Sequence, residues 1–159
     1  MIYRPVKPGE ETEVCSLITR VFSSFVAPQY SQEGIDEFLR YAEPKAMAAR
    51  AETNHFILVT ELKSSIVGMI EVRDSDHICL FFVEGRLQRH GIARELLRRA
   101  LEICLRNKAS LSKISVNSSP NAVEAYKTFG FQAEGPEQTK KGISFVPMAL
   151  CMEGVEVSD

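Results

Sequence analysis

A glycine turn between a strand and a helix constrains the fold of this chain more than any other stretch. The apolar run from His77 to Val83 is typical of a central strand that is covered on both faces of its sheet. Residues 92–107 then repeat apolar side chains with the helical period, which predicts a long amphipathic helix. Gly91 lies at the junction, so a tight turn must join the two elements.

This turn has the properties of an anion site. The first amide N–H groups of a helix have no intrahelical partner, and the helix dipole adds partial positive charge, so such an end attracts phosphate. Gly91 lets an anion approach several amides because it carries no side chain, and Ala93 crowds the backbone little. For residues 88–93 taken alone, a plain turn or helix cap is the alternative interpretation.

The neighbouring segments predict a mixed sheet. Residues 55–62 and 66–73 alternate as two strands joined by a hairpin, and with residues 77–83 they form an antiparallel meander. A short strand at residues 114–116 follows the long helix. Such a strand, helix and strand in succession pair in parallel when both strands lie in one sheet.

Shorter elements complete the chain. Helical periodicity marks residues 10–25 and a segment that starts at Ser31, an N-cap residue. Pro44 interrupts this second helix, and residues 45–52 add another helical turn or two. A last helix is predicted to start with Ser119 as its N-cap and to end at Gly130. The remaining elements are a short first strand and two last strands joined by a polar loop, at residues 1–4, 131–134 and 144–152.

With these features the chain resembles the GNAT superfamily of acyl-CoA-dependent N-acyltransferases. The central motif of that family reads Gln or Arg, two residues, Gly, one residue, then Gly or Ala, and Gln88, Gly91 and Ala93 fit it. Residues 121–131 are similar to a second hallmark, an Asn, a small residue, a Tyr and a closing Gly-Phe. Gly85 departs from the family, which often has proline there to stiffen the loop.

The resemblance implies a GNAT-like fold of the α/β (α+β) class, with a central mixed sheet of six to seven strands flanked by about four helices. Residues 1–152 would form one domain and residues 153–159 a short tail. Acetyl-CoA would be the co-substrate, with its pyrophosphate on the turn and its pantetheine arm along the preceding strand. The implied cofactor-binding residues are Phe82, Val83, Gln88, Arg89, His90, Gly91, Ile92, Ala93, Arg94, Asn117 and Asn121.

Tyr126 is the candidate general acid. Acetyl transfer to an amine needs a neutral amine, a stabilised oxyanion and a proton for the leaving thiolate. A phenol with a pKa near ~10 is protonated at neutral pH and can donate that proton. Tyr126 matches the position at which the family often places this acid, and the alternative is a core residue that packs against Val123 and Phe129. Direct attack of the amine on acetyl-CoA is the expected mechanism.

Glu71 is the candidate base. It lies with Met69 and Arg73 on one face of an interior strand, where an unpaired carboxylate is costly. A salt bridge to Arg73 or to another base is the alternative. His77 could relay protons through water, but its place at the start of a strand also suits closure of the turn.

The charges are distributed unevenly along the chain. The net charge of −2 argues against nonspecific binding of nucleic acid. Residues 86–113 nevertheless contain eight bases against two acids, whereas residues 9–53 contain eight acids against four bases. Two solvated helix faces would explain this pattern, but it also suits an anionic donor at one end and a cationic amine at the other.

Other classes of protein fit the sequence less well. The N-terminus has no apolar segment of signal-peptide length and no run could span a bilayer, so we expect a soluble, cytoplasmic protein without a membrane partner. The four cysteines lie far apart, which suggests neither a metal site nor a disulfide framework. The expected partner is a small-molecule or peptide amine, and a homodimer stays open. A catalytically silent CoA-binding sensor is the alternative function.

Overall fold

The computed structural model describes residues 1–153, so most of the predicted tail, residues 154–159, lies outside the described residues. Its strands are β1 (Ile2–Pro5), β2 (His55–Leu62), β3 (Ser65–Arg73), β4 (His77–Val83), β5 (Lys113–Ser118), β6 (Gln132–Ala133), β7 (Gln138–Lys140) and β8 (Ile143–Cys151). Its α-helices are α1 (Glu11–Val21), α2 (Gln32–Tyr41), α3 (Pro44–Ala51), α4 (Ile92–Asn107) and α5 (Val123–Thr128). The described residues thus have one strand and one helix more than predicted.

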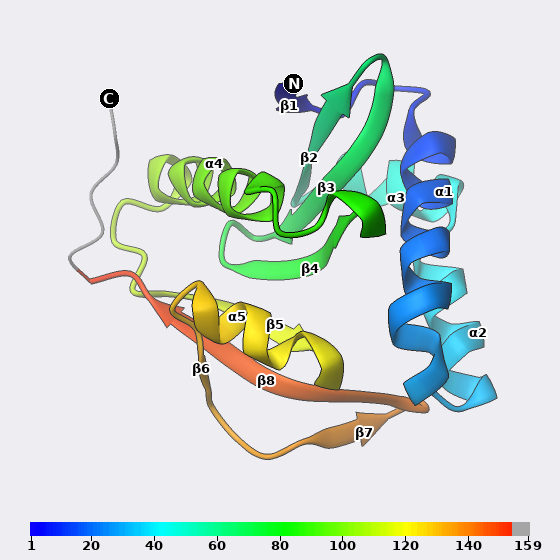
Figure 1. Cartoon of the computed structure of the whole chain (residues 1–159). Helices are drawn as coiled ribbons and strands as arrows, with labels where there is room; N and C mark the ends of the chain where they lie inside the picture. The colour runs from blue at the N-terminus through cyan, green and yellow to red at the C-terminus, as the bar shows by residue number, and fades with distance from the viewer. Residues whose placement is uncertain (154–159) are drawn as a thin grey trace.

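The strands form one mixed sheet in the order β1-β2-β3-β4-β5-β8-β6, with β7 paired to β8 off this path (Figure 1). Strands β1 to β4 are antiparallel, and β4 pairs in parallel with β5. Strand β8 is antiparallel to both β5 and β6. The predicted meander, the strand–helix–strand unit and the mixed α/β class are therefore confirmed.

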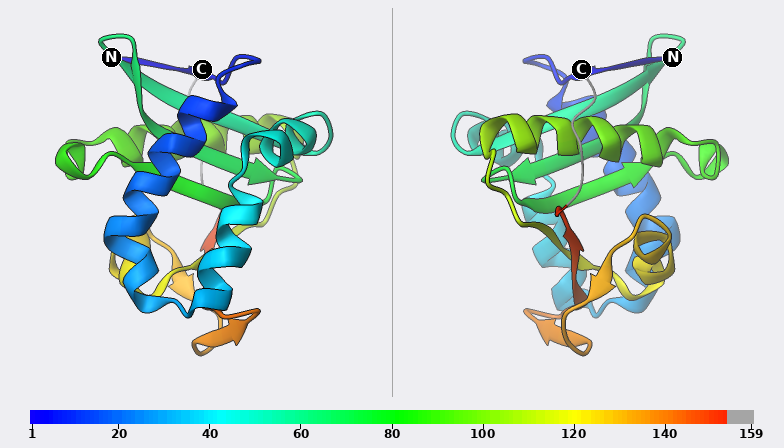
Figure 2. Two further views of the ribbon diagram at one scale, coloured as in Figure 1. Left: turned by 90° about the vertical axis from the view of Figure 1, so that its right-hand side faces the viewer. Right: turned by 90° about the vertical axis from the view of Figure 1, so that its left-hand side faces the viewer.

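Helices cover both faces of the sheet (Figure 2). On one face, α1 and α3 pack on β2, β3 and β4 through a cluster that includes Leu17, Met47 and Met69. On the other face, α4 and α5 pack through a second cluster that includes Leu96 and Tyr126. Strand β3 is buried from Ile66 to Val72, since it lies between the two layers.

Several elements differ locally from the predictions. The first helix continues from α1 into a π-helical turn at Phe22–Val26. The helical segment predicted at residues 45–52 begins at Pro44 itself, because the Glu43 carboxylate caps the first amides of α3. Ser119 makes no capping hydrogen bond, since the chain enters α5 through a 3₁₀ turn at Pro120–Ala122. Strand β7 lies in the segment predicted as a polar loop.

A pair of glycines joins α2 to the turn between β7 and β8. A Cβ on Gly34 would collide with the carbonyl of Gly142, and a Cβ on Gly142 would collide with the amide of Gly34. Ser31, the predicted N-cap of α2, accepts a hydrogen bond from the Gly34 amide at 3.2 Å and donates to the Gly142 carbonyl at 3.3 Å. The two backbones therefore touch without an intervening side chain.

Candidate active site

The glycine turn has a left-handed backbone at the point where α4 begins. Gly91 is the N-cap of α4, with φ +84° and ψ 0°, and Arg89 also has a positive φ of 68°. A Cβ added to Gly91 would meet no atom within 4 Å, so the space in front of this residue is open. Glycine is required there by conformation and not by packing.

The amide N–H groups of residues 89–94 are free. Within residues 1–153, no backbone or side-chain acceptor takes a hydrogen bond from any of them, and the first bond of α4 runs from the Glu95 amide to the Gly91 carbonyl. Gly91 and its two preceding residues are exposed, whereas Ile92 is buried and anchors the helix. Successive free amides in such a turn form a concave site for an anion.

Side chains of the turn tie it to the end of β4. Gln88 donates a hydrogen bond from Nε2 to the Val83 carbonyl at 3.1 Å. His90 donates from Nδ1 to the carbonyls of Gln88, at 2.9 Å, and Leu87, at 3.2 Å. These bonds fix the loop, so two of the predicted ligand residues act on its shape through their side chains.

Most basic side chains that follow the turn are already paired. Arg98, Arg99 and Arg106 form ion pairs with acids on α4 itself. Within the described part of the chain, Arg86, Arg89 and Arg94 form no ion pair, and we call these three the turn arginines. All three are exposed or partly exposed. The basic excess that can attract an anion is therefore concentrated at the turn.

Strands β4 and β5 diverge just below this turn. Among the described residues they pair only at His77 with Ser115 and at Ile78 with Val116. From Cys79 to Val83, the side of β4 that faces β5 has no partner strand. Cys79 is also the bulged residue of the β3–β4 ladder, because Glu71 pairs with Leu80 and Val72 pairs with Ile78.

Tyr126 lies beside this opening. It projects from α5 and is 8% exposed. Its ring packs edge-on against Phe131 at 5.3 Å and Phe81 at 6.2 Å, and Val123 and Phe129 pack against the same core cluster. Its hydroxyl makes no hydrogen bond with any described residue, and burial raises the pKa of this group above its usual value.

The other predicted ligand residues lie around the same opening. Phe82 packs edge-on against Phe38 of α2, at 6.0 Å between ring centroids, while Val83 is buried. Asn117 is exposed on β5, and Asn121 is exposed in the 3₁₀ turn that precedes α5. Neither asparagine side chain makes a hydrogen bond within residues 1–153, so both amides are available to a ligand.

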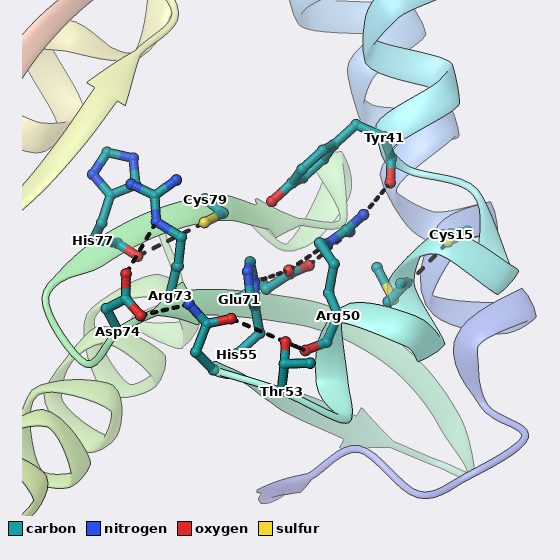
Figure 3. A network of polar contacts seen from close by, with 12 residues as sticks. Cys15, Tyr41, Arg50, Thr53, His55, Glu71, Arg73, Asp74, His77 and Cys79 are labelled. Carbon is teal, nitrogen blue, oxygen red and sulfur yellow. Dashed lines mark hydrogen bonds and ion pairs between the residues drawn. The ribbon is translucent and has the colours of Figure 1, made fainter.

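Glu71 is enclosed by the side chains of Arg50 and His55 (Figure 3). It is 0% exposed on the α1 and α3 face of the sheet. Arg50 of α3 donates to both carboxylate oxygens, from Nε at 2.8 Å and from Nη2 at 3.0 Å, and His55 Nδ1 lies 2.6 Å from Oε2. The salt-bridge alternative is therefore present, but its partner is Arg50, whereas Arg73 pairs with Asp74.

Arg50 also holds Tyr41, at the end of α2. The guanidinium carbon lies 3.7 Å from the centroid of the Tyr41 ring, and Nη1 donates to the Tyr41 carbonyl at 2.7 Å. The Tyr41 hydroxyl makes no hydrogen bond with any described residue, and the nearby Cys79 thiol donates to the His77 carbonyl at 3.9 Å. Burial raises the pKa of both groups, so both are protonated at neutral pH.

His77 stands at the closed end of the opening. Its Nδ1 lies 2.7 Å from the Ser115 hydroxyl, which ties the two strands together where they still pair. Burial lowers the pKa of His77, with a smaller contribution from Arg73, so the ring is neutral at neutral pH.

Sequence reasoning missed Arg50, Tyr41 and Cys79 as parts of this region. The only available signal was the unexplained carboxylate of Glu71 on an interior strand, which demands a partner without naming it. Within residues 1–153 no group of three or more His, Cys, Asp or Glu is arranged to hold a metal ion. In the same residues no helix is both long and apolar enough to cross a membrane.

Comparison with known families agrees with this geometry. The family model of the acetyltransferase (GNAT) domain matches residues 26–152, which is most of the chain. The chain belongs to the GNAT family of acetyltransferases. A comparison with curated proteins finds no match.

Solved structures share the GNAT fold at low sequence identity. A GCN5-related N-acetyltransferase from Rhodopseudomonas palustris is 18% identical, with a TM-score of 0.81 over 94% of both chains. PaiA N-acetyltransferase from Thermoplasma acidophilum, in complex with coenzyme A, is 17% identical, with a TM-score of 0.76 over 94% of this chain and 98% of that chain. A spermidine N-acetyltransferase SpeG chimera from Vibrio cholerae and hSSAT is 19% identical, with a TM-score of 0.63 over 94% of both chains.

Proposed function

We propose that this GNAT protein is an N-acetyltransferase that moves the acetyl group of acetyl-CoA to a primary amine of a small molecule or peptide. The observation that carries the proposal is the run of free amides at residues 89–94, tied by Gln88 to the end of β4. Pyrophosphate is the type of ligand that such a turn accepts. A coenzyme A complex among the structural neighbours supports the same donor.

The residues present fit acetyl-CoA. The space in front of Gly91 is open, and the turn arginines are unpaired among the described residues, so the turn offers both amides and charge to phosphates. The unpaired side of β4, from Cys79 to Val83, offers backbone groups to an extended arm. When bound, acetyl-CoA supplies the acetyl group as a thioester.

Tyr126 is the proposed general acid. Its hydroxyl is protonated at neutral pH, has no hydrogen-bond partner in the described residues and lies on a ring that contacts Phe81 of β4. A free donor beside the opening can give its proton to a departing thiolate. The same burial also suits a core residue, and a phenylalanine substitution separates the two roles.

The base is less directly placed. Glu71 is fully buried with both oxygens engaged, so a substrate amine reaches it only if Arg50 and His55 move away. His77 is neutral, partly exposed and adjacent to the opening, and a neutral imidazole can accept a proton through water. We therefore propose His77, in place of Glu71, as the proton acceptor. We also propose the cytoplasm as the compartment, and a homodimer stays a prediction.

Two measurements test the function. Native mass spectrometry of the purified protein should detect a bound mass equal to CoA or acetyl-CoA. Release of CoA thiol from acetyl-CoA should then accelerate with members of a primary amine panel, and the acetylated amine should appear in equal amount. Failure to bind CoA would refute the proposal. Binding without acceleration by any amine would favour the silent CoA-binding sensor.

A further inference from the structure

The polar network around Glu71 connects the buried sheet to the inner end of the opening between β4 and β5. Cys79 is the first residue of β4 beyond the last β5 pair, and it is also the bulged residue of the β3–β4 ladder. From Val83 to Cys79 the unpaired side of β4 spans about 13 Å, four steps of ~3.3 Å. An extended donor that starts at the turn and follows β4 thus ends next to Cys79.

The Tyr41 hydroxyl is the polar group that faces Cys79 from α2 (Figure 3). Within residues 1–153 this hydroxyl makes no hydrogen bond, because the Cys79 thiol donates to the His77 carbonyl at 3.9 Å instead, so its hydrogen-bonding capacity is unused. Both side chains are partly exposed. The hydroxyl can therefore form a stronger hydrogen bond with a ligand that enters from the side of α2.

Tyr41 is held by contacts to its ring and its backbone carbonyl, and not by contacts to its hydroxyl. The Arg50 guanidinium stacks on its ring at 3.7 Å and binds its carbonyl at 2.7 Å. Glu71 fixes that guanidinium through two hydrogen bonds, which leaves the planar group a single orientation. A lysine in place of Arg50 would keep the charge but would lose both the two-point contact and the stacking.

We propose that the Glu71–Arg50 ion pair is a positioning unit, which holds Tyr41 so that its hydroxyl orients the acceptor amine at the bulge of β4. This inference rests on the proposed acetyl transfer. Tyr41 touches the amine, whereas Arg50 and Glu71 act only through Tyr41. A buried carboxylate that is inaccessible to substrate thereby contributes to the selection of the acceptor.

A double-mutant cycle tests this order of action. Tyr41→Phe keeps the ring on Arg50 and removes only the hydroxyl. It should lower kcat/KM for the amine by about 10- to 100-fold, the loss of one hydrogen bond to a polar or charged group, and leave KM for acetyl-CoA unchanged. Arg50→Lys should produce the same type of defect in the wild type but little further loss in the Tyr41→Phe background. Tyr30→Phe, another half-buried tyrosine on the same side, is the matched control and should keep wild-type kinetics.

Thiol labelling tests the positioning even if no acceptor amine is found. Cys15 and Cys104 are buried, and Cys151 is exposed, so in a Cys151→Ser background Cys79 is the accessible thiol of the described residues. Arg50→Lys should increase the rate at which N-ethylmaleimide labels Cys79 severalfold, because the Tyr41 side chain is no longer held beside it. Peptide mass spectrometry identifies the labelled site.

Distinct outcomes overturn the inference. Unchanged amine kinetics in Tyr41→Phe would remove Tyr41 from the acceptor site. An equal loss from Arg50→Lys with and without the Tyr41 hydroxyl would show that Arg50 does not act through it. Unchanged labelling of Cys79 in Arg50→Lys would show that the ion pair does not hold Tyr41. A wild type that acetylates no amine would refute the proposed function, and the labelling result would still decide the positioning.

Discussion

Replacement of Gly91 by valine should strongly weaken CoA binding while the protein stays folded. Its φ of +84° costs an L residue about 1–2 kcal/mol. A Cβ at this position meets no atom within 4 Å, so no clash adds to that cost. For a chain of this size 1 kcal/mol shifts Tm by about 2–4 °C, which gives an expected fall of about 2–8 °C.

The effect on binding should be larger than the effect on stability. The branched side chain of the introduced valine would occupy the open space in front of the free amides, where a phosphate oxygen is expected. A hydrogen bond to a charged group is worth about 1.5–3 kcal/mol, so the loss of even one raises the Kd for CoA by about 10- to 100-fold. Isothermal titration calorimetry with CoA alone measures this change without any assumption about the acceptor.

Gly9 provides a matched control. It has φ +95°, and a Cβ there also meets no atom within 4 Å, but it lies before α1 and outside the proposed site. Gly9→Val should therefore lose a similar amount of stability and bind CoA as the wild type does. Wild-type affinity in Gly91→Val would refute the anion turn, and an equal loss of affinity in both variants would show a general effect of strain.

CoA should bind more tightly than dephospho-CoA, because the turn arginines are solvent-accessible and can reach the additional phosphate. The affinity for CoA should fall as the Debye length shrinks from about 10 Å at 0.1 M salt to about 3 Å at 1 M. Equal Kd values for the two ligands at low salt would contradict this. Tyr126→Phe should keep acetyl-CoA affinity but lower turnover by about 10²- to 10⁴-fold, whereas a core role predicts wild-type turnover and an unchanged Tm, since the hydroxyl has no partner among the described residues. Hydrogen bonds from Arg4 lower the pKa of Glu10 to about 2, below its ordinary value of 4.5. The stabilisation is therefore present above pH 4.5 and is lost as the pH falls towards 2. At neutral pH, urea unfolding should therefore give Glu10→Gln a free energy of unfolding that is lower than that of the wild type by at most ~1 kcal/mol. The difference should disappear near pH 2. The control Glu52→Gln, at an exposed position, should show no such effect.

The parts of the fold that the sequence predicts well are those with a strong hydrophobic period. Strands β2 and β4 and the end of α4 have the predicted bounds, because their apolar positions repeat without interruption. Strand β7 could not be predicted in this way, since all of its side chains are exposed and polar. Its pairing depends on β8, which supplies the hydrogen-bonding edge.

The candidate site divides in the same way between local and distant contacts. The turn around Gly91 is local, so its residue types reveal it directly. Arg50, the partner of Glu71, is 21 residues away in the sequence. It lies on α3, and only the packing of α3 against the sheet brings the two side chains together. Likewise, the aromatic partners Phe81 and Phe131 of Tyr126 come from β4 and from the segment after α5, and the helical period alone does not predict them.

The contact between Gly34 and Gly142 limits how this scaffold can be recombined. Because each glycine occupies the space that a side chain on the other would need, the start of α2 and the β7–β8 turn are sterically interdependent although 108 positions separate them. A graft that brings α2 from a relative with a larger residue at this point would force the turn away from the helix. Segment exchange intended to alter acceptor choice must therefore transfer both pieces together.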